Sequence, residues 1–150
     1  EELEGDYFSI DSILEQKGLD NIDKKQGCIP LGNFLKANQK ILPKIEESIK
    51  NNRMVIIDGN FYHKEQLEYL IKNLDKTKCY IFTLKAKLST CIERDKKRQN
   101  SYGKEAAEAV YNLVSRFDSG IIIDTENKNE KEIAEEIKRG IKWKYVKPQK

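Results

Sequence analysis

Short apolar runs alternate with segments of mixed apolar and charged residues along most of the chain. Four of these runs have the length of a β-strand: DYFSID (residues 6–11), MVIID (54–58), CYIFTL (79–84) and GIIIDT (120–125). The hydrophobicity of residues 54–58 is continuous rather than alternating, which is typical of a strand buried on both faces of a parallel sheet. The pattern therefore predicts four strands in a parallel sheet.

Apolar residues recur at helical spacing between the strands. They predict a short helix at 12–17, a long helix at 31–51, and further helices at 64–73, 90–98, 103–117 and 130–139. Pro43 lies inside the long helix and should kink it or split it in two. Thr90 with Glu93, and Asn129 with Glu132, have the spacing of helix-capping boxes.

Strands that alternate with helices form βαβ units, so we expect one α/β domain over residues 1–140. Gly140 should end the last helix. Residues 141–150 would then form a separate basic tail.

The composition is that of a charge-rich globular protein, because 35% of the 150 residues are charged and 38% are hydrophobic. The net charge of +3 does not by itself indicate a nucleic-acid partner. No apolar run approaches the roughly 20 residues that a membrane-spanning helix needs, so we expect no membrane partner. Cys28, Cys79 and Cys91 lack the spacing of a metal site and predict reduced thiols in a cytoplasmic protein. The oligomeric state stays open.

Polar side chains gather at the predicted carboxyl ends of the strands. Ser9 and Asp11 end the first strand, Asp58 ends the second with Asn60 close behind it, and Asp124 ends the last. In open parallel sheets ligands bind beyond these ends, and a carboxylate after a run such as MVIID is typical of a Mg²⁺–phosphate site. The alternative is that each aspartate only forms a turn or caps a helix.

Basic residues add to this pattern. The stretch CIERDKKR places Arg94 and Arg98 four residues apart on one helical face, and Arg116 lies further along the chain. Guanidinium groups of this kind could neutralise the charge on a phosphoryl group during its transfer. The alternative is a solvated surface helix with intrahelical ion pairs.

The order of these segments resembles the P-loop kinase group, which includes nucleotide kinases, shikimate and gluconate kinases, and polynucleotide 5′-kinases. YFSIDSIL resembles the second-strand segment of these kinases, and VIIDGNF resembles their Walker B-like strand with the turn after it. IFTLKAKLSTCIERDKKRQ is similar to the segment that leads into their lid, and AVYNLVSRFD to the helix that leaves it. The resemblance implies a three-layer parallel sheet with helices on both faces, and a short lid at about residues 94–116.

The resemblance also implies an activity, which is ATP-dependent phosphoryl transfer to a nucleotide, a nucleoside or another small acceptor with a hydroxyl or phosphate group. It implies ATP and Mg²⁺ as the cofactors. Asp11 would orient or deprotonate the acceptor, and Asp58 would hold Mg²⁺. The charge on the transferred group would be stabilised by Arg94, Arg98 and Arg116, and the acceptor pocket would be lined by Ser9, Asn60, Phe61 and Tyr62.

One motif of that group is absent from the sequence. The phosphate-binding pattern G-x-x-x-x-G-K-[ST] does not occur in the 150 residues. In this group the motif follows the central strand of the sheet, and the loss of that strand would leave two unpaired edges. We therefore expect the 150 residues to be a segment of a longer chain that carries the motif before Glu1. The alternative is a different strand order in a non-catalytic scaffold that binds no ATP.

The end of the sequence supports another class of function. KRGIKWKYVKPQK contains basic residues interleaved with Trp143 and Tyr145 and no acidic residue. Such a pattern can stack on bases while it follows phosphates, so a nucleic-acid 5′-end kinase or a nucleic-acid binder stays open. The alternative is a solvated terminus.

Overall fold

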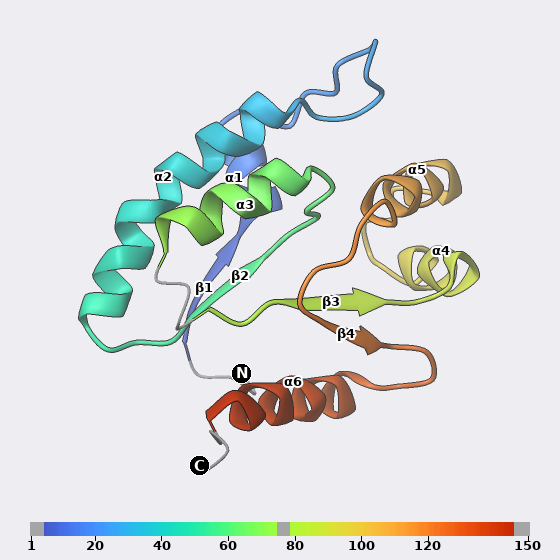
Figure 1. The fold of residues 1–150 in the computed structure, drawn as a ribbon. Coiled ribbons are helices and arrows are strands. Elements are labelled where there is room, and N and C mark those ends of the chain that lie inside the picture. Colours follow the sequence, from blue (N-terminus) through green and yellow to red (C-terminus); the bar gives the residue numbers. More distant parts are fainter. Residues whose placement is uncertain (1–4, 75–78, 146–150) are drawn as a thin grey trace. The chain divides into compact units, whose positions relative to one another are not determined.

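The computed structural model describes residues 5–74 and 79–145, and only the backbone of residues 142–145 (Figure 1). The described residues divide into two compact units. The N-terminal unit ends at Cys79 and the C-terminal unit begins at Tyr80. Each unit contains parallel strands connected through helices, so the α/β class is confirmed.

In the N-terminal unit, strand β1 (Asp6–Ser9) lies parallel to strand β2 (Val55–Asp58). The register places Ser9 opposite Asp58, so both strands end at the same edge. Helices α1 (Ile10–Gln16) and α2 (Leu31–Lys50) connect the two strands, and α3 (Lys64–Asn73) follows β2. The predicted bounds of α3 are confirmed.

Helix α2 supplies most of the core of this unit and packs against both α1 and α3 (Figure 1). Four of the apolar residues that predicted this helix are buried, which are Phe34, Ile41, Leu42 and Ile45, while Ile49 is exposed. Ala37 is buried with them. The helix runs through Pro43 without a break, so the predicted split into two helices is wrong. Apolar side chains are buried on both sides of Pro43, and this packing outweighs the hydrogen bond that proline removes.

The first strand is shorter than the sequence predicted. It ends at Ser9, whose side-chain oxygen accepts a hydrogen bond from the N–H of Ser12 at 3.3 Å and caps α1. Asp11 therefore lies in the first turn of α1 and not at the tip of a strand. The prediction failed because a helix cap within the run DYFSID stops the extended backbone early.

The loop between α1 and α2 extends beyond the ends of both helices (Figure 1). Its tip is held by an antiparallel bridge between Asp23 and Cys28. The side chain of Asp23 accepts hydrogen bonds from the N–H groups of Lys25 and Gln26, both at 2.9 Å. Gly27 has a φ of 66°, which favours glycine at this turn. The predicted loop is thus a folded turn.

In the C-terminal unit, strand β3 (Phe82–Lys85) lies parallel to strand β4 (Ile121–Asp124), with Lys85 opposite Asp124. Helices α4 (Leu88–Lys96) and α5 (Lys104–Val114) connect the strands and pack on each other (Figure 1). Helix α6 (Glu130–Tyr145) follows β4 and packs against it.

The two predicted capping boxes have different outcomes. The box before α6 is confirmed, because the N–H of Asn129 donates to Glu132 Oε2 at 2.8 Å and the N–H of Glu132 donates to Asn129 Oδ1 at 3.1 Å. The box at Thr90 is wrong, because α4 begins earlier, at Leu88, after an N-cap residue without a capping side chain.

The prediction that Gly140 ends the last helix is also wrong. Helix α6 continues to Tyr145, and so the boundary between the predicted domain and its tail falls inside a helix. A Cβ atom at position 140 would lie 2.7 Å from Phe82 Cε1 and 3.2 Å from Ile121 Cδ1. Glycine therefore lets α6 approach the strands closely, which is a tertiary reason for its presence that a local pattern does not reveal.

The described residues form two two-stranded parallel sheets, one in each unit. The predicted single three-layer sheet stays a prediction. Within the ranges 5–74 and 79–145, no helix is long and apolar enough to cross a membrane. The predicted roles of Trp143, Tyr145 and the rest of the basic tail concern side chains outside the described residues.

Candidate functional site

The carboxyl ends of β1 and β2 bring two carboxylates to one edge of the N-terminal unit. Asp58 is the last residue of β2, it is exposed, and its Oδ2 accepts a hydrogen bond from the hydroxyl of Tyr7 at 2.8 Å. This hydrogen bond, with burial as a lesser cause, raises the pKa of Tyr7, so the phenol stays protonated as a donor. Tyr7 therefore fixes one oxygen of Asp58 from the neighbouring strand.

Asp11 lies in the first turn of α1, and its Oδ2 accepts a hydrogen bond from Asn60 Nδ2 at 3.0 Å. Loss of contact with water raises the pKa of Asp11, and the negative charge of Asp58 raises it further. The backbone N–H and the side-chain amide of Asn60 act in the opposite direction. Asp11 remains exposed as a residue, so its partly shielded carboxyl group can still exchange protons with a ligand or with water.

The turn after β2 is attached to the loop between α1 and α2 through Ile29. The hydroxyl of Tyr62 accepts a hydrogen bond from the N–H of Ile29 at 3.2 Å, and His63 Nε2 lies 2.9 Å from the oxygen of Ile29. Because a carbonyl oxygen can only accept, His63 carries its proton on Nε2. Phe34 packs edge-on against the rings of Tyr62 and His63, with centroid distances of 5.0 and 5.5 Å.

The residues predicted to line the acceptor pocket thus have different surroundings. Ser9 caps α1, Asn60 contacts Asp11, and Phe61 is half-buried. Tyr62 is buried, and this burial raises its pKa to about 12. The structure brings Ser9, Asn60 and both carboxylates to one edge, while Tyr62 packs into the core.

In the C-terminal unit, Arg94 connects α4 to the end of β4. Its Nη1 donates to Thr125 Oγ1 at 2.9 Å, and its Nη2 donates to the backbone carbonyl oxygen of Thr125 at 2.7 Å. Thr125 is buried, and both its N–H and its hydroxyl donate to the oxygen of Lys85, at 2.7 and 2.9 Å. The prediction that Arg94 and Arg98 share one helical face is wrong, because α4 ends at Lys96 and Arg98 lies in the turn after it, where its N–H donates to the carbonyl oxygen of Asp95 at 3.0 Å. Arg98 and Arg116 are exposed.

Two acidic residues that were not among the predicted site residues fix the two ends of α4, and Asp95 is the one within the predicted lid. Asp95 is buried and accepts hydrogen bonds from the hydroxyl of Ser101 at 2.7 Å, the N–H of Tyr102 at 3.3 Å and the N–H of Gly103 at 3.0 Å. The bond from Ser101 is the largest cause of the lowered pKa of Asp95, and the positive charge of Arg98 contributes to it. Asp95 therefore fixes the turn between α4 and α5.

Glu126 provides the missing N-terminal cap of α4. Its Oε1 accepts a hydrogen bond from the N–H of Lys87 at 2.6 Å and its Oε2 accepts one from the hydroxyl of Thr90 at 3.1 Å. These bonds, that of Lys87 first, lower the pKa of Glu126. The only sequence signal for this cap was an acidic residue directly after a strand, at DTE.

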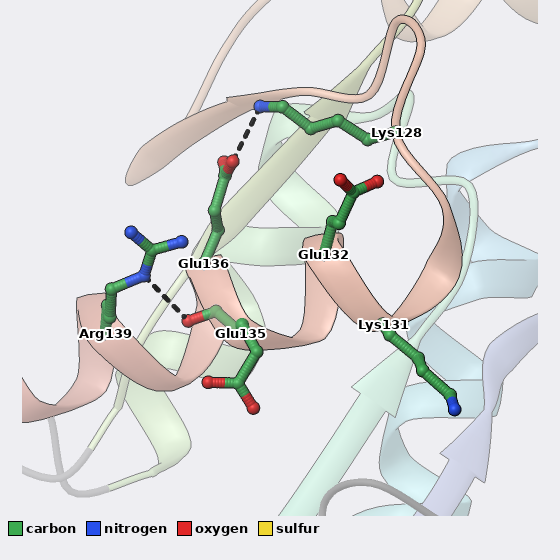
Figure 2. A pocket seen from close by; sticks show the side chains of 6 residues that line it. All are labelled: Lys128, Lys131, Glu132, Glu135, Glu136 and Arg139. Carbon is green, nitrogen blue, oxygen red and sulfur yellow. Dashed lines mark hydrogen bonds and ion pairs between the residues drawn. The ribbon is translucent and has the colours of Figure 1, made fainter.

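A surface hollow of about 320 Å³ lies beside α6. Figure 2 shows its lining, which consists of Lys128, Lys131, Glu132, Glu135, Glu136 and Arg139. Its charges balance, because three of the lining side chains are basic and three are acidic, and Lys128 pairs with Glu136 at 2.7 Å. Arg139 Nε donates to the backbone carbonyl oxygen of Glu135 at 3.3 Å. It contains none of the predicted site residues, and an open hollow of balanced charge offers little selectivity for a ligand. The strand ends are therefore the better candidate site.

Comparison with protein families gave one finding. A family model described as "Chromatin associated protein KTI12" matches residues 32–142, which is well over half of the chain. The matched range includes Asp58, Asn60 and the three predicted arginines, while Ser9 and Asp11 precede it. Searches of the curated proteins and of the solved structures found no match.

Proposed function

The chain belongs to the KTI12 family, a member of the P-loop kinase-like group, and from this premise we propose that it takes part in ATP-dependent phosphoryl transfer. The observation that carries the proposal is the pair of carboxylates at the ends of β1 and β2. Each is exposed and each is oriented by a hydrogen bond from a different segment, Asp58 by Tyr7 and Asp11 by Asn60.

Asp11 is the proposed base or orienting group for the acceptor. A carboxylate in this role accepts a proton from a hydroxyl within hydrogen-bond reach. Partial shielding and the charge of Asp58 raise its pKa, which moves it toward the range in which a base works near neutral pH. Its Oδ2 is oriented by Asn60, so the carboxylate has a defined direction before an acceptor arrives.

Asp58 is the proposed residue on the Mg²⁺ side of the site. Its hard carboxylate oxygens are the ligand type that Mg²⁺ prefers, and one carboxylate is enough where water and phosphate oxygens complete the shell. Within residues 5–74 and 79–145, there is no group of three or more His, Cys, Asp or Glu side chains that could hold a metal ion by itself. The proposed site is therefore one in which Asp58 shares the Mg²⁺ with water and phosphate oxygens. Bound Mg²⁺ would neutralise charge on the phosphate oxygens.

The proposed activity needs a phosphate-binding loop, and the G-x-x-x-x-G-K-[ST] pattern is absent from the 150 residues. The proposal therefore concerns the protein in its full length. Arg98 and Arg116 are the exposed candidates for charge stabilisation in the transition state, and Arg94 would act from its position on Thr125. The acceptor is a nucleotide, a nucleoside or another small molecule with a hydroxyl or phosphate group.

The test is an assay of phosphoryl transfer from ATP with the full-length protein. The acceptor panel contains nucleosides, nucleotides, small alcohols and 5′-hydroxyl oligonucleotides. Asp11→Asn and Asp58→Asn should each lower the turnover on the accepted substrate, while Asp20→Asn, in the exposed loop after α1, makes the same charge change and should not. Normal turnover in both site variants would refute the assigned roles.

A second candidate function is association with nucleic acid or chromatin. It is favoured by the description of the family model and by the basic sequence of residues 141–150. Phosphate contacts make binding fall steeply as salt rises. Oligonucleotide binding should therefore show a steep salt dependence that deletion of residues 141–150 reduces. Binding that is insensitive to salt, or to the deletion, would argue against this function.

A further inference from the structure

The turn after β2 approaches α1 unusually closely. A Cβ atom at position 59 would lie 2.8 Å from Ile10 Cβ, and Ile10 is completely buried. Only glycine allows this approach without a shift of the turn or of the core. Because Asp11 follows Ile10 directly, the close approach at Gly59 brings Asn60 within hydrogen-bond distance of the Asp11 carboxylate.

The same turn is held from its other side. The N–H of Tyr62 donates to the carbonyl oxygen of Asn60 at 3.0 Å, which closes a three-residue turn centred on Phe61 and fixes the carbonyl group of Asn60. Tyr62 and His63 in turn bind the N–H and the oxygen of Ile29, and both rings pack on Phe34. The backbone of Asn60 is therefore fixed between the close contact at Gly59 and a buried anchor at Tyr62.

We propose that Asn60 is a positioning residue for Asp11, held in place by the Gly59 approach to Ile10 and by the attachment of Tyr62 and His63 to Ile29. The inference rests on the proposed function, because it assigns Asn60 a role that acts through the proposed base. It replaces the role that the sequence predicted for Asn60, which was contact with the acceptor. The amide of Asn60 is already committed to the Asp11 carboxylate.

The two roles differ in their kinetics. A positioning residue supports the reacting geometry, so Asn60→Ala should lower kcat by about 10- to 100-fold with KM little changed. A residue that contacts the acceptor would instead raise KM. Asn73→Ala is the matched control, because the side-chain amide of Asn73 also donates a hydrogen bond within the N-terminal unit, to the backbone carbonyl oxygen of Tyr69 at 2.7 Å. This variant should leave kcat unchanged.

A double-mutant cycle tests whether Asn60 acts through Asp11. If it does, Asn60→Ala should cause no further loss of kcat in an Asp11→Asn background. Losses that multiply in the double variant would show that Asn60 acts independently of Asp11 and would overturn the proposal. A rise in KM that persists in that background would overturn it in favour of acceptor contact.

A measurement without turnover separates this proposal from the proposed function. In the NMR spectrum of the full-length protein, the side-chain amide protons of Asn60 should shift on Asp11→Ala, because their carboxylate acceptor is lost. The side-chain amide of Asn73 should not shift. An unchanged Asn60 amide would overturn the positioning role even in an active enzyme. A shifted amide in a protein that transfers no phosphoryl group to any acceptor would refute the proposed function, and the positioning role with it.

Discussion

Replacement of Gly140 by alanine sets two effects of opposite sign against each other. Gly140 lies inside α6, where alanine is favoured over glycine by about 1 kcal/mol of helix propensity. The new Cβ would lie 2.7 Å from Phe82 Cε1 and 3.2 Å from Ile121 Cδ1, so the ring or the helix has to move. Overpacking of this kind costs about 1–3 kcal/mol. We expect the cost to win, with a net destabilisation of about 1 kcal/mol.

Urea unfolding of the protein, followed by circular dichroism, measures this balance. Gly32→Ala is the control, because Gly32 lies in α2 and its added Cβ would meet no atom within 4 Å. That variant should keep the propensity gain alone and be slightly more stable than the wild type. A second variant, Phe82→Leu, removes the ring edge that Gly140 faces.

In the Phe82→Leu background, Gly140→Ala should change sign and become stabilising, because the space for the Cβ is then available. The reasoning would be refuted if Gly140→Ala stabilised the wild-type protein. It would also be refuted if the alanine destabilised both backgrounds equally. Equal losses would indicate that the added Cβ clashes with a group other than the ring of Phe82, such as Ile121.

Three further outcomes can be measured in the same way. Tyr62→Phe keeps the ring but leaves the N–H of Ile29 without its acceptor, so the free energy of unfolding measured in urea should fall by about 1–3 kcal/mol. Arg94→Ala removes both hydrogen bonds to Thr125 and should destabilise the C-terminal unit by a similar amount, whereas a purely catalytic Arg94 would leave stability unchanged. The lowered pKa of Asp95 gives a stability contribution that is present above its ordinary value of 3.8 and is lost as pH falls through the folded value. Asp95→Asn should therefore make the free energy of unfolding fall less as the pH is lowered. An unchanged pH dependence at low pH would contradict this contribution from Asp95.

The features that the sequence predicted well depend on neighbouring residues. The bounds of α3 follow from its apolar spacing, and the cap before α6 follows from two side chains three positions apart, Asn129 and Glu132. The parallel pairing of the strands follows from the alternation of strands and helices. In each case the stabilising contacts lie within one element or follow from chain order, so a local pattern contains the information.

The features that the sequence did not predict depend on distant residues. Helix α4 is capped by Glu126, which lies 39 positions after Lys87 in the chain. Gly140 is explained by Phe82 and Ile121, and neither residue is near it in the sequence. Such contacts exist only after the strands have paired, and tertiary packing then overrides the local rule that glycine ends a helix.

Arg94 shows how a structural contact and a predicted charge role can occur together. The spacing of Arg94 and Arg98 predicted two guanidinium groups on one helical face, but Arg98 lies beyond the end of α4, while Arg94 lies within it and donates two hydrogen bonds to Thr125. Both groups that accept from Arg94 are neutral, a hydroxyl and a carbonyl, so they orient the guanidinium without cancelling its charge. A charge that is already fixed needs no reorganisation when a phosphoryl group develops charge, and this is the condition under which electrostatic stabilisation is most effective. Its attachment to Thr125 is therefore compatible with the predicted role of Arg94, and loss of stability and loss of turnover should accompany each other in Arg94→Ala.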